Sequence, residues 1–276
     1  MPYIKVGQEN TGSIDLYYED HGSGQPVVLI HGYPLSGRGW DKQIPPLLQD
    51  GHRVITYDRR GFGKSSQPTK GYDYDTFAND LHVLMETLDL RDVTLVGHSM
   101  GTGEVTRYLS RFGSARVRKG VLVSPIPPFL LQTKDNPDGV PASLFDGFMH
   151  DASQDMPAWM KSFLDNFYNA DKYLGTLVSD QAYQMSWNLA STAGGTAAVA
   201  CIPTWETDFR ADLPKLDVPI LVIQGDDDRV LPFPKTGKRL PDMIKDCQLV
   251  VIDGGPHGIA WTHSDQVNAA LLKFMA

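Results

Sequence analysis

Gly97-His98-Ser99-Met100-Gly101 is the stretch of sequence that decides the fold. It follows the apolar run Val93–Val96 and precedes a helix-like segment, Glu104–Leu109. A G-x-S-x-G sequence between a buried strand and a helix predicts a nucleophile elbow, a tight turn that presents its serine at a helix N-terminus. Glycines are expected at both ends because a Cβ would obstruct the turn. A chain with 26 glycines can contain this pattern by chance, so the prediction depends on partner residues elsewhere.

Six short runs of consecutive apolar residues lie along the chain, with helix-length segments between them. Such runs are typical of strands that are buried on both faces of a parallel sheet. They occupy residues 27–30, 54–57, 93–96, 121–123, 220–223 and 249–252. Residues 14–18 alternate and favour an antiparallel edge strand, whereas residues 77–88 have apolar side chains at helical spacing. The pattern predicts an α/β protein with a mostly parallel, doubly wound sheet flanked by helices.

The strand pattern disappears between about residue 125 and residue 212. After a proline-rich start at residues 125–128, this segment is rich in aromatic residues and methionine. We interpret residues 126–212 as a helical cap inserted into a core of residues 1–125 and 213–276, which together form a single catalytic unit. Most of the aromatic side chains are expected to pack the cap helices together. Trp205 is the candidate for contact with a substrate, with core packing an equally open role.

A serine nucleophile needs a neighbouring base, and the base needs an acidic group that orients it. With a nucleophile elbow, the expected chain order is serine, acid, histidine. Three histidines follow Ser99, and His257 is the preferred base because its glycine-rich loop follows the last strong strand. His150 falls in the cap segment, and His263 falls at the start of the last helix. His257 therefore completes the predicted pair with Ser99.

Three adjacent aspartates follow the strand at residues 220–223, and we choose Asp228 as the acid, with Asp226 as the alternative. A tetrahedral intermediate also needs backbone donors for its oxyanion. The residue after the nucleophile, Met100, is expected to supply one N–H, and the loop after the strand at residues 27–30 the other. Tyr33 is the natural second donor, because the proline that follows it has no N–H. His31, in the same loop, is expected to support the loop rather than act as a base.

The overall composition excludes several other classes of function. The formal net charge is −8, and the absence of a basic block argues against binding to nucleic acid or to an anionic membrane. No apolar run is long enough for a transmembrane helix, and no signal peptide is visible, so a cytoplasmic protein is expected. The two cysteines, Cys201 and Cys247, are expected to be buried thiols, and no compact set of metal ligands is apparent. The sequence leaves open whether copies of the chain form a homo-oligomer.

Three motifs together resemble the α/β-hydrolase superfamily, namely residues 31–34, 58–66 and 97–101. Longer segments narrow the resemblance to the cofactor-free bacterial haloperoxidases, also described as perhydrolases and aryl esterases. These segments are residues 99–105, 126–131, 166–169, 207–210, 256–258 and 261–263. The resemblance covers essentially the whole chain, cap included. It implies an α/β-hydrolase fold with a mostly parallel eight-stranded sheet and an inserted helical cap.

Carried over to this sequence, the resemblance places the family's triad at Ser99, Asp228 and His257. It places the oxyanion donors at Tyr33 and Met100. One position departs from the family, in which an aromatic residue precedes the serine; here that residue is a histidine. The departure puts substrate preference in doubt and leaves the chemistry unchanged.

The resemblance implies a serine hydrolase that forms an acyl-enzyme at Ser99 from a carboxylic ester or a carboxylic acid. Water would complete hydrolysis, whereas hydrogen peroxide would release a peracid that oxidises halide and halogenates organic compounds. No metal, haem or other cofactor is implied, and lactones or lactams are further candidate substrates. The alternatives are a C–C bond or γ-lactam hydrolase on the same fold, or a non-enzymatic hydrolase-fold binding protein. Dehalogenases and epoxide hydrolases are disfavoured because they use a carboxylate nucleophile at the elbow.

Overall fold

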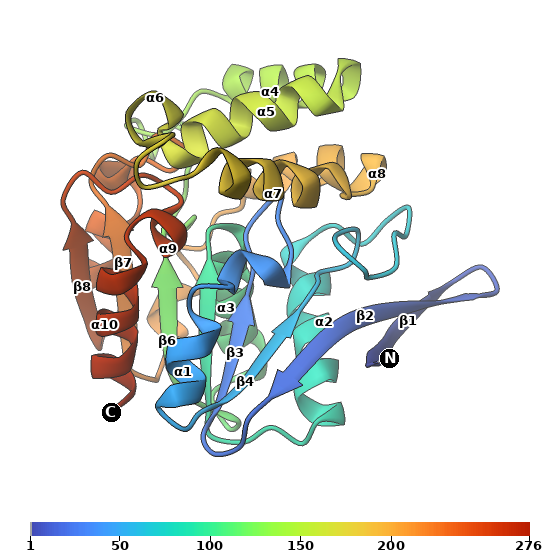
Figure 1. The fold of residues 1–276 in the computed structure, drawn as a ribbon, viewed down its shortest axis with the longest axis vertical. Helices are drawn as coiled ribbons and strands as arrows, with labels where there is room; N and C mark the ends of the chain where they lie inside the picture. The colour runs from blue at the N-terminus through green and yellow to red at the C-terminus, as the bar shows by residue number, and fades with distance from the viewer. Residues whose placement is uncertain (1) are drawn as a thin grey trace.

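An eight-stranded sheet forms the centre of the molecule (Figure 1), with the strand order β1-β2-β4-β3-β5-β6-β7-β8. The computed structural model describes residues 2–276, so Met1, the first residue of the predicted core, lies outside the described residues. The strands are β1 (Tyr3–Glu9), β2 (Gly12–His21), β3 (Pro26–Ile30), β4 (Arg53–Tyr57), β5 (Val93–His98), β6 (Val117–Val123), β7 (Ile220–Gly225) and β8 (Cys247–Ile252). The β1–β2 and β2–β4 pairs are antiparallel, and the other pairs are parallel. The predicted eight-stranded, mostly parallel sheet is confirmed.

Two details at the edges of the sheet differ from the sequence interpretation. The alternating segment at residues 14–18 lies in β2, which is antiparallel but not an edge strand, because β1 pairs along its outer side. Strand β8 forms the opposite edge, and Val251 within it is 45% exposed. An apolar run there does not indicate burial on both faces. Cys247, also in β8, is only partly buried, whereas Cys201 is buried as expected.

Helices cover both faces of the sheet. Helices α1 (Ile44–Gln49) and α10 (Ser264–Met275) lie on the front face in Figure 1, and α2 (Tyr74–Thr87) and α3 (Met100–Phe112) lie on the other face. Strand residues alternate between the two cores, because successive strand side chains point to opposite faces. Leu29 packs in the same core as Leu271 of α10, and Val28 packs in the same core as Leu81 of α2.

Five α-helices follow β6 in the chain before β7 begins, and they lie above the carboxyl ends of the strands (Figure 1). They are α4 (Ala142–Gln154), α5 (Met156–Tyr168), α6 (Ala170–Tyr173), α7 (Asp180–Ser191) and α8 (Gly195–Ala200). The buried apolar side chains of α4, α5, α7 and α8 belong to one hydrophobic cluster that also contains Tyr33 and Met100 of the sheet-end loops. The cap therefore shares a core with the loops that hold the predicted site.

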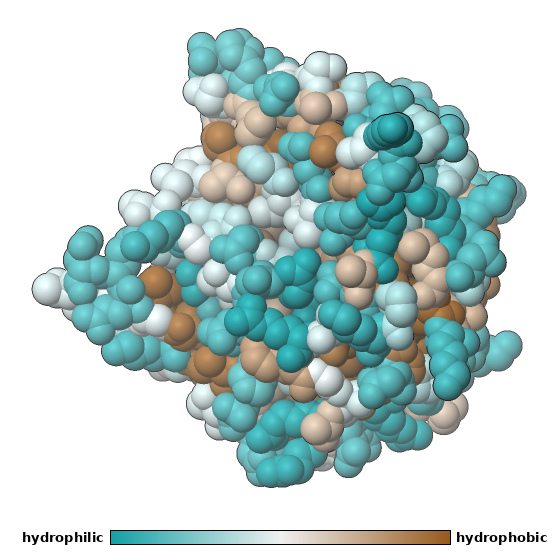
Figure 2. Space-filling view, turned by 180° about the vertical axis from the view of Figure 1, so that it is seen from behind, coloured by the Kyte–Doolittle hydropathy of each residue, from teal (hydrophilic) through white to brown (hydrophobic). Residues whose placement is uncertain are grey.

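The face covered by α2 and α3 is mostly hydrophilic. Figure 2 shows hydrophobic residues there as separate spots among hydrophilic ones, with the β1–β2 hairpin projecting at one side. Across residues 2–276, no helix is long and apolar enough to cross a membrane. The same residues contain no group of three or more His, Cys, Asp or Glu side chains that could hold a metal ion.

Candidate active site

The turn between β5 and α3 holds Ser99 in a conformation that few residues adopt. Ser99 has φ 53° and ψ −121° and stands at the N-cap position of α3. A Cβ on Gly97 would lie 2.4 Å from the carbonyl oxygen of Gly101, and a Cβ on Gly101 would lie 2.4 Å from that of Ile30. The two glycines are therefore required by close backbone approach. Strained, tightly packed turns of this kind are typical of functional sites.

Three side chains from separate loops form a continuous hydrogen-bonded chain. The Oγ of Ser99 lies 2.8 Å from Nε2 of His257, and Nδ1 of His257 lies 2.9 Å from Oδ2 of Asp228. All three residues are buried. Asp228 Oδ1 accepts hydrogen bonds from the backbone N–H groups of Val230 at 3.0 Å and Leu231 at 2.8 Å. These contacts fix the carboxylate so that His257 donates from Nδ1 and presents Nε2 to the Ser99 hydroxyl.

The alternative histidine and aspartate candidates lie elsewhere. His150 is exposed on α4. Nδ1 of His263 lies 2.8 Å from the hydroxyl oxygen of its neighbour Thr262. Asp226 accepts a hydrogen bond from the backbone N–H of Gly254 at 2.7 Å, which braces the loop that carries the base. None of these side chains contacts the Ser99 hydroxyl in the hydrogen bonds of residues 2–276.

The supporting roles of two residues, Gln224 and His98, are missing from the sequence interpretation. Gln224, fully buried at the end of β7, donates from Nε2 to Oδ2 of Asp228 at 3.2 Å and to the Leu231 carbonyl at 2.7 Å. Nε2 of His98 lies 3.1 Å from the carbonyl oxygen of His257. Burial, and secondarily the nearby His257, lower the pKa of His98 to about 3. His98 is therefore neutral and donates from Nε2, which ties the nucleophile strand to the base loop. The one signal in the sequence for Gln224 is a polar residue that continues a buried strand.

The predicted oxyanion donors face no competing acceptor. Neither the Met100 N–H nor the Tyr33 N–H donates a hydrogen bond to another group within residues 2–276. His31 supports the Tyr33 loop, because its Nε2 accepts a hydrogen bond from the backbone N–H of Arg59 at 2.9 Å. Burial, followed by the charge of Arg59, lowers the pKa of His31 well below its usual value, so the ring is neutral. Arg59 is held in turn by a buried ion pair with Glu104 at 2.8 Å.

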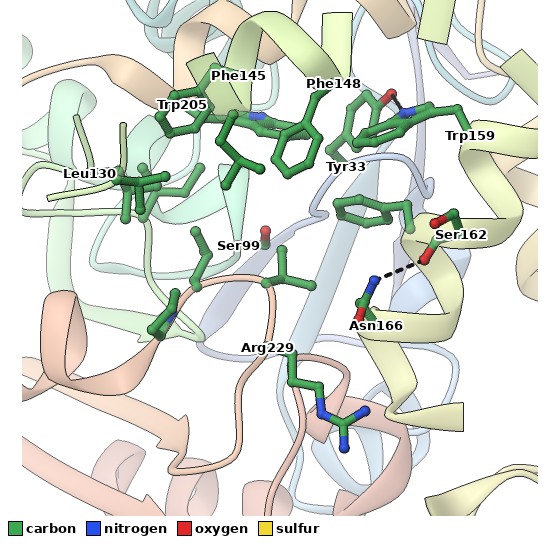
Figure 3. Close-up of a pocket in the computed structure, with 17 residues that line it drawn as sticks. Tyr33, Ser99, Leu130, Phe145, Phe148, Trp159, Ser162, Asn166, Trp205 and Arg229 are labelled. Atoms are coloured by element: carbon green, nitrogen blue, oxygen red, sulfur yellow. Dashed lines mark hydrogen bonds between the residues drawn. The ribbon is translucent and has the colours of Figure 1, made fainter. Parts of the chain in front are cut away.

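A cavity of about 230 Å³ opens above Ser99, between the triad loops and the cap. Figure 3 shows aromatic side chains of the cap gathered over the serine, with Ser162 and Asn166 of α5 on one side. Trp205, from the short helix Ile202–Glu206 that follows α8, lines this cavity. Arg229 also lines it, but its guanidinium is paired with Asp171 at 2.6 Å. An apolar cavity with few polar groups is the usual form of a small-molecule site.

Comparisons with known proteins agree with this architecture. A family model described as the alpha/beta hydrolase fold matches residues 25–264. A Synechocystis sp. protein named "Putative non-heme chloroperoxidase" is 59% identical over 275 residues, which cover 100% of both chains. A "Bifunctional esterase/perhydrolase DCH" of Acinetobacter calcoaceticus is 34% identical over 95% of this chain and 96% of its own. The crystal structure of a bromoperoxidase from Bacillus anthracis has a TM-score of 0.95 and 45% identity, and covers 99% of each chain.

Proposed function

The chain belongs to the non-heme haloperoxidase family of α/β-hydrolases, and from this premise we propose that it is a serine esterase and perhydrolase. Its substrates are small carboxylic esters, with carboxylic acids as acyl donors and water or hydrogen peroxide as acyl acceptors. The observation that carries the proposal is the buried chain of hydrogen bonds from Ser99 through His257 to Asp228. Such a chain activates a serine hydroxyl for acyl transfer.

In the first half of the reaction, Ser99 Oγ attacks the substrate carbonyl carbon and its proton passes to Nε2 of His257. The carbonyl oxygen becomes an oxyanion that accepts hydrogen bonds from the Met100 and Tyr33 N–H groups. Asp228 stabilises the imidazolium that has formed. His257 then returns the proton to the leaving alcohol, or to the hydroxyl lost from a carboxylic acid as water, and the acyl group remains on Ser99 as an ester.

In the second half, water or hydrogen peroxide attacks the acyl-enzyme and gives its proton to His257. Collapse of the intermediate restores the Ser99 hydroxyl and releases a carboxylic acid or a peracid. The peracid then oxidises bromide or chloride in solution, taking up one proton, and yields hypohalous acid and the carboxylic acid. The halide is thus oxidised away from the triad, and the hypohalous acid halogenates organic compounds.

The cap supplies specificity in this proposal. Residues 126–212 form the inserted cap, and residues 1–125 and 213–276 carry the elbow and the loops of the acid and the base. Trp205 contributes to the wall against which the acyl or alcohol group packs, as its place along the cavity supports. A cytoplasmic location is a further prediction, to be checked by cell fractionation. The enzyme is a candidate homo-oligomer, which sedimentation would test.

One experiment tests the shared mechanism. The wild-type protein should hydrolyse p-nitrophenyl acetate, and with peroxide and bromide it should halogenate monochlorodimedone in acetate buffer. In phosphate buffer without a carboxylic acid or ester, halogenation should fall to background, and EDTA should change neither rate. Ser99→Ala should lower the rates of both activities by several orders of magnitude, because both pass through one acyl-enzyme. Halogenation that survives in Ser99→Ala, or full halogenation in phosphate, would sink the proposal.

Two of the alternatives differ from the proposal at the site itself. A carboxylate nucleophile, as in dehalogenation or epoxide hydrolysis, is excluded by the serine at the elbow. A binding protein without activity would be expected to lack a triad member, and this chain retains Ser99, Asp228 and His257. A C–C bond or γ-lactam hydrolase would use the same triad, so turnover of γ-lactams and of simple esters by the purified protein distinguishes these readings.

A further inference from the structure

The side chain of Tyr33 reaches from the oxyanion loop into the cap. Its hydroxyl donates a hydrogen bond to the carbonyl oxygen of Ala198 in α8 at 3.0 Å. The same oxygen accepts a hydrogen bond from Nε1 of Trp159 in α5 at 3.2 Å, which Figure 3 marks with a dashed line. Tyr33 is 1% exposed, and burial raises the pKa of its hydroxyl, so the group stays protonated and keeps its donor. One tyrosine thus joins two cap helices to a loop of the core.

Aromatic packing holds the Tyr33 ring from several sides. Ring centroids lie 5.1 Å away for Trp205, 5.4 Å for Phe163 and 5.9 Å for Phe62, each in an edge-to-face arrangement. Edge-to-face pairs at these distances are favourable. The two hydrogen bonds at the hydroxyl add directional contacts that fix the end of the ring farthest from the backbone.

The backbone of the same residue carries the second oxyanion donor in the proposed mechanism. The N–H and the ring of Tyr33 are attached to one Cα, so an anchored ring restricts the direction in which that N–H points. Oxyanion donors act only when they lie about 2.7–3.1 Å from the position of the developing charge. A small displacement of the N–H therefore weakens transition-state binding more than substrate binding.

We propose that Trp159 is a positioning residue, which aligns the Tyr33 N–H for the oxyanion through its indole hydrogen bond to the Tyr33 hydroxyl. This inference rests on the proposed acyl-transfer function and adds a role for the cap in the chemical step. Trp159 also lines the cavity above Ser99, so the wall that meets the substrate is hydrogen-bonded to the oxyanion loop.

Trp205 provides a matched control. It lines the same cavity and packs against the same tyrosine ring, but it makes no hydrogen bond to Tyr33 within residues 2–276. Trp159→Phe and Trp205→Phe therefore each replace an indole of the same cavity wall with a phenyl ring. Only Trp159→Phe also removes a hydrogen bond to the oxyanion loop. Tyr33→Phe removes the hydroxyl while keeping the ring and the backbone donor.

The experiment measures kcat and KM for p-nitrophenyl acetate, with inhibition constants for phenylboronic acid and benzyl alcohol. The boronic acid bonds to Ser99 as a tetrahedral anion with an oxygen at the oxyanion position. Benzyl alcohol, in contrast, is expected to fill only the apolar cavity and to place no charge at the oxyanion position. Trp159→Phe and Tyr33→Phe should each lower kcat about tenfold and weaken the boronate by a similar factor. Benzyl alcohol affinity should fall by a similar factor in Trp159→Phe and Trp205→Phe, because both replace an indole of the cavity wall with a smaller ring, and should stay within about threefold in Tyr33→Phe. Trp205→Phe should change KM and benzyl alcohol binding, with kcat within about twofold.

The double variant gives the sharpest outcome. Once Tyr33→Phe has removed the hydroxyl, Trp159→Phe should cause no further loss in kcat, because the proposed connection is already absent. Independent, additive losses would overturn the inference, as would equal kcat losses in Trp159→Phe and Trp205→Phe. Circular dichroism checks that each variant is folded. Failure of the acyl-transfer proposal appears separately, as ester hydrolysis that survives Ser99→Ala in the otherwise wild-type chain.

Discussion

Asp228→Asn replaces one oxygen of the triad carboxylate with an amide nitrogen and leaves the shape of the side chain unchanged. In the wild type, Oδ1 accepts two backbone N–H groups, from Val230 and Leu231, and Oδ2 accepts from His257 and Gln224. Four donors thus point at one carboxylate. An asparagine has one acceptor oxygen, so it can accept from only one of these two pairs of donors. Its NH₂ group, itself a donor, then faces the other pair.

The structure predicts how the conflict resolves. The amide oxygen stays with the two backbone N–H groups, because the backbone of the loop cannot turn away, and the NH₂ then faces His257. The imidazole relieves the clash by moving its proton to Nε2, so that Nδ1 accepts from the amide. Nε2 then donates toward Ser99 and can no longer accept its proton. A wrong tautomer of this kind costs about 10⁴ in kcat, or about 5 kcal/mol of transition-state stabilisation.

Steady-state hydrolysis of p-nitrophenyl acetate measures this loss, with circular dichroism as the check on folding. The fold should survive, since one poorly paired buried donor costs about 1–3 kcal/mol of the free energy of unfolding. Asp226→Asn and Asp227→Asn are the controls. Asp226 bonds a backbone N–H, and Asp227 pairs with Lys172 near the surface, so each should lower kcat less than about tenfold. A severe loss of kcat in Asp226→Asn, or an Asp228→Asn variant that keeps a tenth of the wild-type kcat, would refute the assignment of the acid.

Two further predictions concern residues around the triad. Because the pKa of His98 is about 3 in the native protein and about 6.5 when unfolded, the unfolded state binds more protons below pH 6.5 and stability falls as the pH falls through that value. In urea unfolding, the stability advantage of the wild type over His98→Gln should therefore shrink by about 2 kcal/mol between pH 7.5 and pH 5, and parallel pH profiles for the two proteins would contradict the buried, neutral histidine. Trp205→Ala should alter the ranking of esters by acyl size, at roughly 1–3 kcal/mol per methylene gained or lost against the wall. Unchanged relative kcat/KM values across acetate, butyrate and hexanoate esters would remove Trp205 from the substrate pocket.

Much of the fold could be predicted because buried parallel strands have a simple signature. Runs of branched apolar residues occur at each of the central strands. Glycine-containing loops that follow some of these runs mark the carboxyl ends of the strands. The apolar runs of the sequence do not indicate β1, because an edge strand needs few buried side chains; Ile4 is its one buried residue. The edge position of β8 was hidden for a related reason, since an apolar run does not show whether a further strand pairs beside it.

The candidate site was predictable to the extent that chemistry restricts residue type and chain order. Ser99, His257 and Asp228 carry groups that acyl transfer requires, and each follows a strand whose position the sequence reveals. Gln224 and His98 act through hydrogen bonds to a carboxylate oxygen and a backbone carbonyl. Those contacts depend on how separate loops meet at the sheet edge, and no spacing within the chain encodes them. Supporting contacts of this kind become apparent only in the folded structure.

The end of α5 and the following α6 connect the cap to the loops of both triad partners of Ser99. The Phe167 carbonyl accepts the N–H of Gly258, beside the base, at 2.7 Å, and the Tyr173 hydroxyl donates to the Gly254 carbonyl at 2.6 Å. Asn169, fully buried at the junction of the two helices, donates to the backbone carbonyl of Asp227, beside the acid, at 2.9 Å.

Together with the Tyr33 contacts, these bonds tie the cap to the loops of the acid, the base and the Tyr33 donor. A cap bound at so many points is a structural part of the active site rather than a cover laid over it. Substitutions at its junctions with the core should therefore lower kcat, whereas substitutions on the open wall of the cavity should change substrate ranking. This division follows from the free energies involved, because misplacing a donor or a base by a fraction of an ångström weakens the transition state selectively. A smaller apolar wall weakens ground state and transition state alike.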